Sequence, residues 1–176
     1  REINKLKKIE WDVLSTPFSA TAEIPHYSSV FPEDQLFGAE TSTHTRSVEE
    51  YVTAMRRFGV AWVCPPQHTG VASKLVTLIS KAHQELRTSK QAARTFVLAS
   101  DDLSTEAKAC IAAGAQPLYK FRKGSVRMEN IRSWDVTAPI VAATPFPKAL
   151  TLWVFDNEKA QQTLPKLATL ARAIQE

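Results

Sequence analysis

The chain has 176 residues, the length of one domain, and its 44% hydrophobic and 23% charged residues are the balance of a folded globular protein, which excludes overall disorder. The longest apolar runs, Val60–Cys64 and Leu150–Phe155, are much shorter than the roughly 20 residues that cross a bilayer, so we expect no contact with a membrane. A net charge of +4 is compatible with a polyanionic partner but does not require one.

Two cysteines and four histidines limit the covalent and metal chemistry that the chain can support. There is no CxxC pair and no pair of histidines four residues apart, so we expect no metal site. A disulfide between Cys64 and Cys110 is formally possible, but two cysteines are not the framework of a secreted protein. Free thiols, together with the absence of a signal-peptide pattern in this sequence, predict an intracellular protein whose compartment stays open.

The first third of the sequence has few regular patterns. Residues 1–10 predict a charged lead-in, either solvated or a short helix, and Trp11–Leu14 predicts a short strand that ends in turn residues. The segment 18–47 predicts irregular structure with one short strand near Tyr27–Val30. An irregular stretch this long usually carries function or is held by a partner.

From Ser47 onward, helical and strand patterns alternate. Ser47 with Glu50 forms a capping box at the start of the first helix, and Gly59 ends it. The expected elements are then strands at Val60–Cys64, Arg94–Ala99, Pro139–Ala143 and Leu150–Asp156, helices at Val71–Arg87, Ser104–Ala113 and Thr163–Ile174, and a hairpin of Leu118–Phe121 with Ser125–Met128. This order predicts one α/β domain over residues 1–176, with a mostly parallel sheet and an antiparallel edge.

A buried strand that runs directly into two prolines is the feature with the clearest chemical meaning. In Cys64-Pro65-Pro66-Gln67 the prolines fix φ and present a carbonyl without a competing N–H. The segment should open a rigid loop at the carboxyl edge of the sheet, where open α/β sheets bind ligands.

The order of short motifs resembles adenine-N6 methyltransferases of the phage and retroelement type. Their (Asp/Asn/Ser)-Pro-Pro-(Tyr/Phe) tetrad corresponds to Cys64, Pro65, Pro66 and Gln67, and the resemblance extends over roughly residues 11–157. The other matching segments are Trp11-Asp-Val-Leu-Ser15, Ile24-Pro-His-Tyr27 and Pro145-Phe-Pro-Lys-Ala-Leu150. The resemblance implies a Rossmann-like three-layer sandwich in which the tetrad accepts hydrogen bonds from the amino group of a flipped adenine.

The same resemblance implies S-adenosylmethionine as the cofactor, held by Asp12 with Ser15 and Thr16 beside it, and by Glu40 on a ribose hydroxyl. The alternatives are that Asp12 caps a turn and that Glu40 is a solvated loop acid. The chain has only five glycines and no Gly-rich cofactor loop, so we expect weak affinity or none for S-adenosylmethionine.

The tetrad departs from the family at both ends. A thiol at Cys64 is a poor acceptor beside a carboxylate or carboxamide, and Gln67 cannot stack as an aromatic ring does. Loss of methyl transfer is therefore the prediction. Cys64 could instead be a nucleophile with His68 as its base, but a cysteine that closes an apolar strand is more often a buried, inert thiol.

Cations and aromatic residues alternate late in the chain. Strand alternation places Tyr119 and Phe121 on one face and their basic neighbours on the other. Two interpretations stay open: a phosphate-contacting patch, or a solvated hairpin tip whose aromatic rings face the core. The basic residues are Lys120, Arg122, Lys123 and Arg127.

Three functions follow from these patterns. The first is a pseudoenzyme, a methyltransferase-like domain that acts as a binding or scaffold module in a nucleic-acid-associated assembly. The second is an active S-adenosylmethionine-dependent adenine-N6 methyltransferase on DNA or RNA. The third is a protein-interaction subunit without nucleic acid, in which residues 18–47 and Trp134 form the partner surface.

Overall fold

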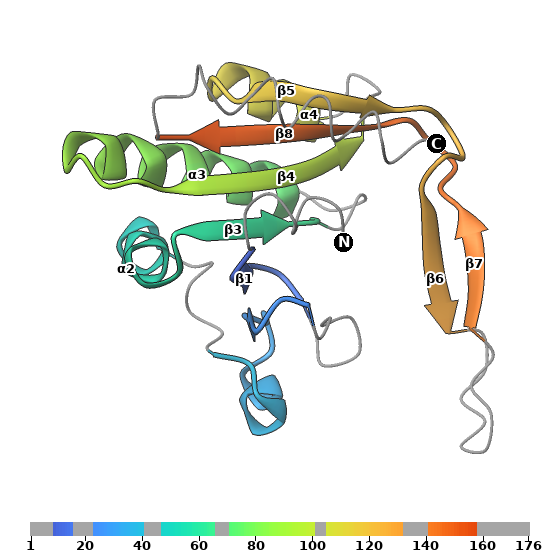
Figure 1. Cartoon of the computed structure of the whole chain (residues 1–176), viewed down its shortest axis with the longest axis horizontal. Helices are drawn as coiled ribbons and strands as arrows, with labels where there is room; N and C mark the ends of the chain where they lie inside the picture. Colours follow the sequence, from blue (N-terminus) through green and yellow to red (C-terminus); the bar gives the residue numbers. More distant parts are fainter. Residues whose placement is uncertain are drawn as a thin grey trace.

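The computed structural model describes residues 9–15, 23–40, 47–65, 71–100, 105–131 and 141–157. Figure 1 shows their arrangement as a sheet with helices and a separate two-stranded ribbon. The elements are β1 (Trp11–Asp12), β2 (His26–Tyr27), the 3-10 helix η1 (Pro32–Phe37), α2 (Val48–Phe58), β3 (Val60–Val63), α3 (Val71–Thr88), β4 (Arg94–Ser100), α4 (Thr105–Ala112), β5 (Gln116–Phe121), β6 (Arg127–Ile131), β7 (Val141–Pro145) and β8 (Leu150–Asp156).

Six strands form the main sheet in the order β2-β1-β3-β4-β8-β5. The four strands β2, β1, β3 and β4 are parallel, and β8 runs antiparallel to both β4 and β5. The fold is therefore α/β with a mostly parallel sheet and antiparallel pairing toward one edge, as the sequence predicted. The predicted strand Val60–Cys64 lies inside the sheet as β3, which ends at Val63 and leaves Cys64 directly after it.

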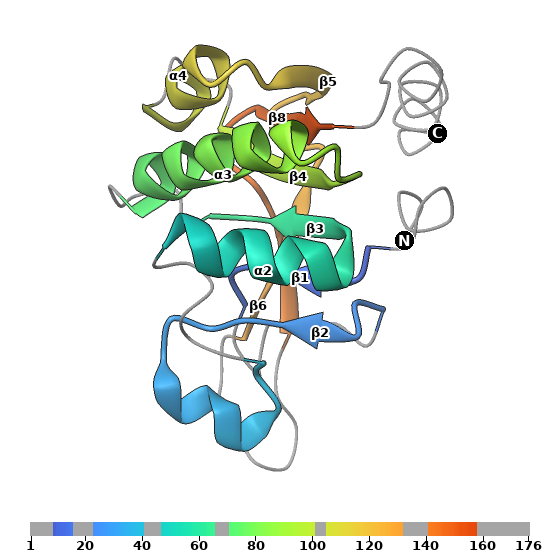
Figure 2. The same cartoon turned by 90° about the vertical axis from the view of Figure 1, so that its left-hand side faces the viewer.

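Both faces of the sheet are buried, which explains why its central strands are continuous in apolar residues. Along β4, Val97 and Ala99 join the core cluster that contains residues of all three α-helices, and Phe96 and Leu98 join a second cluster on the other face. Figure 2 shows α2 and α3 side by side in front of the sheet. The helix expected over residues 163–174, on which a third layer would depend, lies outside the described residues.

Helix α2 begins and ends where its sequence signals predict. The Ser47 hydroxyl accepts a hydrogen bond from the Glu50 N–H at 3.1 Å. Gly59 follows the last turn with φ of +75°, a conformation that side chains with a Cβ rarely adopt. This helix then leads directly into β3, so the cap and the glycine fix where that strand starts.

The end of the predicted lead-in is not solvated. Ile9 is buried in the second core cluster, and the Glu10 N–H donates to the Val60 carbonyl at 3.1 Å. The solvated alternative therefore does not hold at Ile9, whose apolar side chain is buried against the sheet, and residues 9–10 are not helical. The described helices include none that is both long and apolar enough to cross a membrane.

The predicted hairpin of Leu118–Phe121 with Ser125–Met128 does not form. β5 pairs with β8, and β6 pairs with β7 in a separate sheet. A turn closed by Ser125 N–H to the Arg122 carbonyl connects them. The local turn signal was correct, but pairing with the long apolar strand β8 buries the apolar side chains of β5, which a two-stranded hairpin cannot do.

Candidate functional site

The structure brings together Asp12 and Cys64, two residues that the sequence singled out separately. Asp12 pairs with Trp62 in the β1–β3 ladder, and the Val13 N–H donates to the Trp62 carbonyl at 2.9 Å. Cys64 lies two residues beyond Trp62, so it shares a sheet face with Asp12. Both residues lie at the carboxyl edge of the sheet, where the ligand site was expected.

Asp12 is a buried carboxyl group at this edge. Burial raises its pKa to about 6, although hydrogen bonds from the Leu14 N–H and from Ser15 act in the opposite direction. The bond from the Leu14 N–H to the Asp12 Oδ1 measures 3.2 Å and is the turn cap that the alternative interpretation described. Asp12 therefore caps a turn and also lies at the candidate site.

Cys64 is a half-buried thiol packed against the second core cluster. Burial, and to a smaller extent the nearby charge of Asp12, raise its pKa to about 11. At neutral pH only about one molecule in 10⁴ would carry a thiolate, which is the form that attacks as a nucleophile. These properties argue for the inert-thiol interpretation. Cys64 and Cys110 are both free cysteines.

Ser100 extends this arrangement to the next strand, and the sequence analysis missed it. Val63 pairs with Val97 in the β3–β4 ladder, so the next residue of β4, Leu98, lies beside Cys64. Ser100 is two residues beyond Leu98 and therefore lies on the same face of the sheet as Cys64. Ser100 is buried at the end of β4. The only available signal was a serine at the end of an apolar strand, and the strand was predicted to end one residue earlier.

Glu40 lies elsewhere and is already bonded within the protein. Its Oε1 contacts the His26 Nδ1 at 2.6 Å, and its Oε2 accepts from the Arg57 Nη1 at 2.8 Å. Burial opposes ionisation of Glu40, but the hydrogen bond to His26 and the charge of Arg57 outweigh it and lower its pKa. The carboxylate is therefore not a solvated loop acid, because it links the β2 region to α2.

Only part of the predicted tetrad and of its neighbouring site residues lies within the described residues. Pro65 directly follows Cys64 in the structure, whereas Thr16, Pro66 and Gln67 lie outside the described residues. The structure therefore places the first half of the tetrad and the acid beside it.

Exposed cations gather where β5 leaves the sheet and the two-stranded ribbon begins. Backbone hydrogen bonds from Gly124 N–H to the Phe146 carbonyl at 3.1 Å and from Phe146 N–H to the Val126 carbonyl at 2.8 Å join the two chain segments there. Lys148 lies two residues beyond Phe146, and these bonds place it in the same region as Lys120, Arg122 and Lys123. The sequence analysis did not include Lys148. We call Lys120, Arg122, Lys123 and Lys148 the cationic root; all four are exposed.

The aromatic residues of this region belong to the core side. The Tyr119 and Phe121 rings lie 4.8 Å apart in an edge-to-face contact, which agrees with their predicted placement on one face. Both are half-buried against the second core cluster. The solvated-tip interpretation was thus right about the rings, and any contact with phosphate would depend on the cations. Arg127 begins β6, and its side chain is not among those described.

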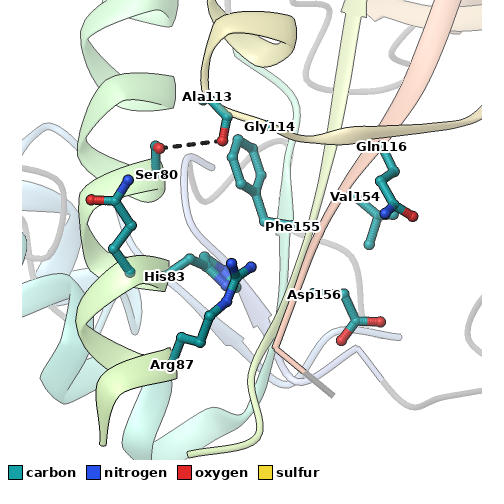
Figure 3. Close-up of a pocket in the computed structure, with 10 residues that line it drawn as sticks. Ser80, His83, Arg87, Ala113, Gly114, Gln116, Val154, Phe155 and Asp156 are labelled. Carbon is teal, nitrogen blue, oxygen red and sulfur yellow. Dashed lines mark hydrogen bonds between the residues drawn. The ribbon is translucent and has the colours of Figure 1, made fainter. Parts of the chain in front are cut away.

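A cavity of about 140 Å³ lies at the opposite end of the sheet (Figure 3). Asp156, which lines it, pairs with Arg94 at the first residue of β4, and both ring nitrogens of His83 have hydrogen-bond partners. Asp156 and His83 therefore form their hydrogen bonds and ion pair with other residues of the protein. Among the described residues there is no cluster of three or more His, Cys, Asp or Glu side chains that could hold a metal ion.

Comparisons with protein-family models, curated proteins and solved structures find no match to this chain. Its function must therefore be argued from the arrangement of its own residues.

Proposed function

We propose that this chain is a methyltransferase-like domain that binds nucleic acid and does not transfer methyl groups. Support for the Rossmann-like part comes from the mostly parallel sheet and from the position of Cys64-Pro65 directly after an interior strand. The same edge holds Asp12, the acid that the resemblance assigns to the cofactor. The shared position of Asp12 and Cys64 at this edge supports the proposal.

One observation carries the loss of activity: the pKa of Cys64 is raised to about 11. In the family the first tetrad side chain accepts a hydrogen bond from the substrate amino group. A protonated, half-buried thiol is a weak acceptor, and the raised pKa keeps it from becoming the strongly accepting thiolate. A protonated thiol at Cys64 therefore favours loss of the methyl-transfer step.

Calorimetry with S-adenosylmethionine and with S-adenosylhomocysteine tests this part of the proposal. We expect no heat of binding from either compound at millimolar concentration. A micromolar dissociation constant that Asp12→Ala abolishes would instead favour the active enzyme. The Glu33→Ala variant, in exposed η1, is the matched control because it removes an acid far from the tetrad.

The nucleic-acid part rests on the cationic root. No acidic residue occurs in the sequence from 116 to 128 or from 145 to 150, so the exposed charged residues of these two segments are all cations. Such a patch supplies a sequence-independent attraction for phosphates that weakens with salt. Filter binding of DNA and RNA at low and at physiological salt tests it, and no binding at low salt would contradict it.

A protein-interaction subunit is the second candidate, because η1 and the residues before it expose large apolar side chains. In the part of the chain that the structure describes, Leu36 is 87% exposed and Phe37 is 69% exposed. Val30 and Phe31 continue this surface, which water would normally disfavour. If the chain binds no nucleic acid, this candidate takes first place.

A further inference from the structure

The 3-10 helix η1 and the residue before it hold apolar side chains in water. Leu36 and Phe37 are the two most exposed large apolar side chains among the described residues, and Phe31 is also exposed. None of the six residues of η1 is buried, so the core gains nothing from its apolar side chains. We call Phe31, Leu36 and Phe37 the apolar knob. Its position indicates a contact made outside the chain.

Polar contacts fix the backbone that carries the apolar knob. The Tyr27 hydroxyl donates to the Phe37 carbonyl at 2.7 Å, and the Glu40 N–H donates to the Tyr27 carbonyl at 2.8 Å. The Ser29 hydroxyl donates to the Asp34 Oδ2. The knob is therefore held in place before any partner arrives, which lowers the entropy that binding would cost.

A cavity of matching size lies at the other edge of the main sheet. Its volume is about 290 Å³, and it is lined by Pro117, Leu118, Tyr119 and Lys120 of β5 and by Thr151 and Trp153 of β8. A cavity of about 150 Å³ lined by apolar side chains is large enough to hold benzene. The β5–β8 cavity therefore has room for the ring of Phe37 with Leu36 beside it.

Trp153 gives this cavity a polar group that lacks a partner. Its side chain is 6% exposed, and within the described part of the chain its Nε1–H has no hydrogen-bond acceptor. A buried donor without an acceptor is unfavourable. The last turn of a helix carries carbonyl groups that have no partner within the helix, so a helical occupant can supply the acceptor that Trp153 lacks.

The two surfaces carry opposite charges. In η1 the charged residues are Glu33 and Asp34, whereas every charged residue from 116 to 123 is basic. Of these, Arg122 and Lys123 are exposed in the turn after β5. Opposite charges favour contact of the knob with the cavity. A contact between two knobs would instead bring like charges together, which opposes it.

We propose that the apolar knob of one copy of this chain docks into the β5–β8 cavity of a second copy. This self-association goes beyond the proposed function and does not depend on nucleic acid. The knob follows β2, and β2 and β5 are the two edge strands of the main sheet. Figure 2 shows β5 at one end of the molecule, with β2 and the blue η1 at the other. A head-to-tail contact of this kind builds a ring or an open chain of copies.

Sedimentation velocity of the nucleic-acid-free protein tests the proposal over a range of about 1–300 µM, in which small interfaces associate. We expect the wild type to form species larger than a dimer as its concentration rises. Leu36→Ser with Phe37→Ser should weaken this association about tenfold or more, because these side chains fill the cavity. Ile111→Ser is the matched control, since Ile111 is another exposed apolar residue, on α4, and its loss should change nothing.

The cavity is tested from the other side by Pro117→Glu, which places a carboxylate on its wall. This carboxylate would repel the acidic η1 and should also weaken association about tenfold or more. Thr77→Glu adds the same charge at an exposed position of α3 and should leave association unchanged. Circular dichroism checks that each variant is folded.

Mixing the two variants distinguishes a head-to-tail contact from other modes of assembly. The knob variant keeps an intact cavity, and the cavity variant keeps an intact knob. Their equimolar mixture should therefore form a pair of one copy each and nothing larger, although each variant by itself stays monomeric.

Three results would overturn the proposal. They are a wild type that stays monomeric over the whole range, a wild type that stops at a closed dimer, and folded knob or cavity variants that associate as the wild type does. The two results on the wild type need no variant, so they decide the matter even if a substitution prevents folding. Because nucleic acid is absent throughout, none of these results bears on nucleic-acid binding.

Discussion

The Asp12 carboxylate at the end of β1 raises the pKa of the Cys64 thiol at the end of β3. Both groups stay protonated to a higher pH than they would in water, because Asp12 is buried, Cys64 is half-buried, and the two lie at one edge of the sheet. A buried carboxyl group with a raised pKa costs folding free energy when it ionises. Groups with such shifts gather at binding sites, and this is the physical reason for placing the candidate site here.

Asp12→Asn should stabilise the protein at neutral pH. The pKa of Asp12 is about 6 in the folded state against an ordinary value of 3.8, so Asp12 stays protonated to a higher pH in the folded protein than in the unfolded chain. The free energy of unfolding therefore decreases as the pH rises from about 3.8 to about 6. The loss at pH 7.5 is about 3 kcal/mol. Asparagine retains the acceptor for the Leu14 N–H, so urea unfolding should show a gain of about 1–3 kcal/mol at pH 7.5 and little gain at pH 4. Glu33→Gln in exposed η1 is the control, and a loss at pH 7.5 in the Asp12 variant would show that its charge is favourable.

The same substitution should make Cys64 more reactive. In a Cys110→Ala background, Cys64 is the one cysteine left in the chain. Because Asp12 raises the pKa of Cys64, removing the charge should lower the pH at which iodoacetamide alkylates it. The measurement is the alkylation rate from pH 7 to pH 10 by mass spectrometry. Identical profiles with and without Asp12→Asn would contradict the coupling.

His83 should destabilise the fold in acid. Its Nδ1 contacts the Asn157 Oδ1 at 3.2 Å, an atom that can only accept, so Nδ1 carries the proton. Its Nε2 then accepts from the Thr95 hydroxyl at 2.8 Å, and the Thr95 oxygen accepts from the Tyr51 hydroxyl at 2.9 Å. The chain of hydrogen bonds is complete with neutral His83, and burial lowers its pKa to about 4.

Because the pKa of His83 in the folded state lies below its ordinary value of 6.5, the unfolded state binds more protons, and stability falls as pH drops from about 6.5 to about 4. The contribution amounts to about 3 kcal/mol. Chemical unfolding at several pH values should show a stability gap between the wild type and His83→Gln that narrows over this range. A gap that is constant with pH would exclude His83 as its source.

Asp156→Ala should be among the most damaging single substitutions. The Arg94 Nη2 lies 2.6 Å from the Asp156 Oδ2, and the two side chains are 1% and 5% exposed. Removing one partner leaves a buried charge and should cost about 3–5 kcal/mol of unfolding free energy. Arg57→Ala is the contrast, since the Arg57 side chain is 60% exposed in its pair with Glu40, and the expected cost is about 0–1 kcal/mol. Equal costs in thermal unfolding would contradict this ranking.

The double variant Arg122→Ala, Lys123→Ala should weaken nucleic-acid binding for every sequence. Each phosphate contact contributes about −0.9 to the slope of log affinity against log salt for duplex DNA, and about −0.7 for single strands. The variant should flatten the slope by roughly one to two units. Lys74→Ala with Lys81→Ala removes the same charge from exposed positions of α3 and should leave most of the slope intact. Equal effects of the two double variants would mean that the net charge of the chain, and not the cationic root, determines the salt dependence. No effect of either variant would mean that the cationic root does not contact nucleic acid.

The sequence alone determined most of the regular elements and where they begin. The Ser47 cap and Gly59 bound α2 because they act through hydrogen bonds and dihedral angles within a few residues. The apolar runs that became β3 and β4 were recognised because strands buried on both faces have few polar residues. From these elements the α/β class and the position of Cys64 at the carboxyl edge followed.

Only the tertiary structure decided which segments meet. Asp12 and Cys64 are 52 positions apart, and their coupling depends on the pairing of β1 with β3. Glu40 gained its partners from β2 and α2, and Lys148 joined the root through backbone bonds of Phe146. Strand pairing is selected by how much apolar surface each alternative buries over the whole sheet, so local turn signals could not reveal that β5 pairs with β8 and leaves β6 and β7 as a ribbon.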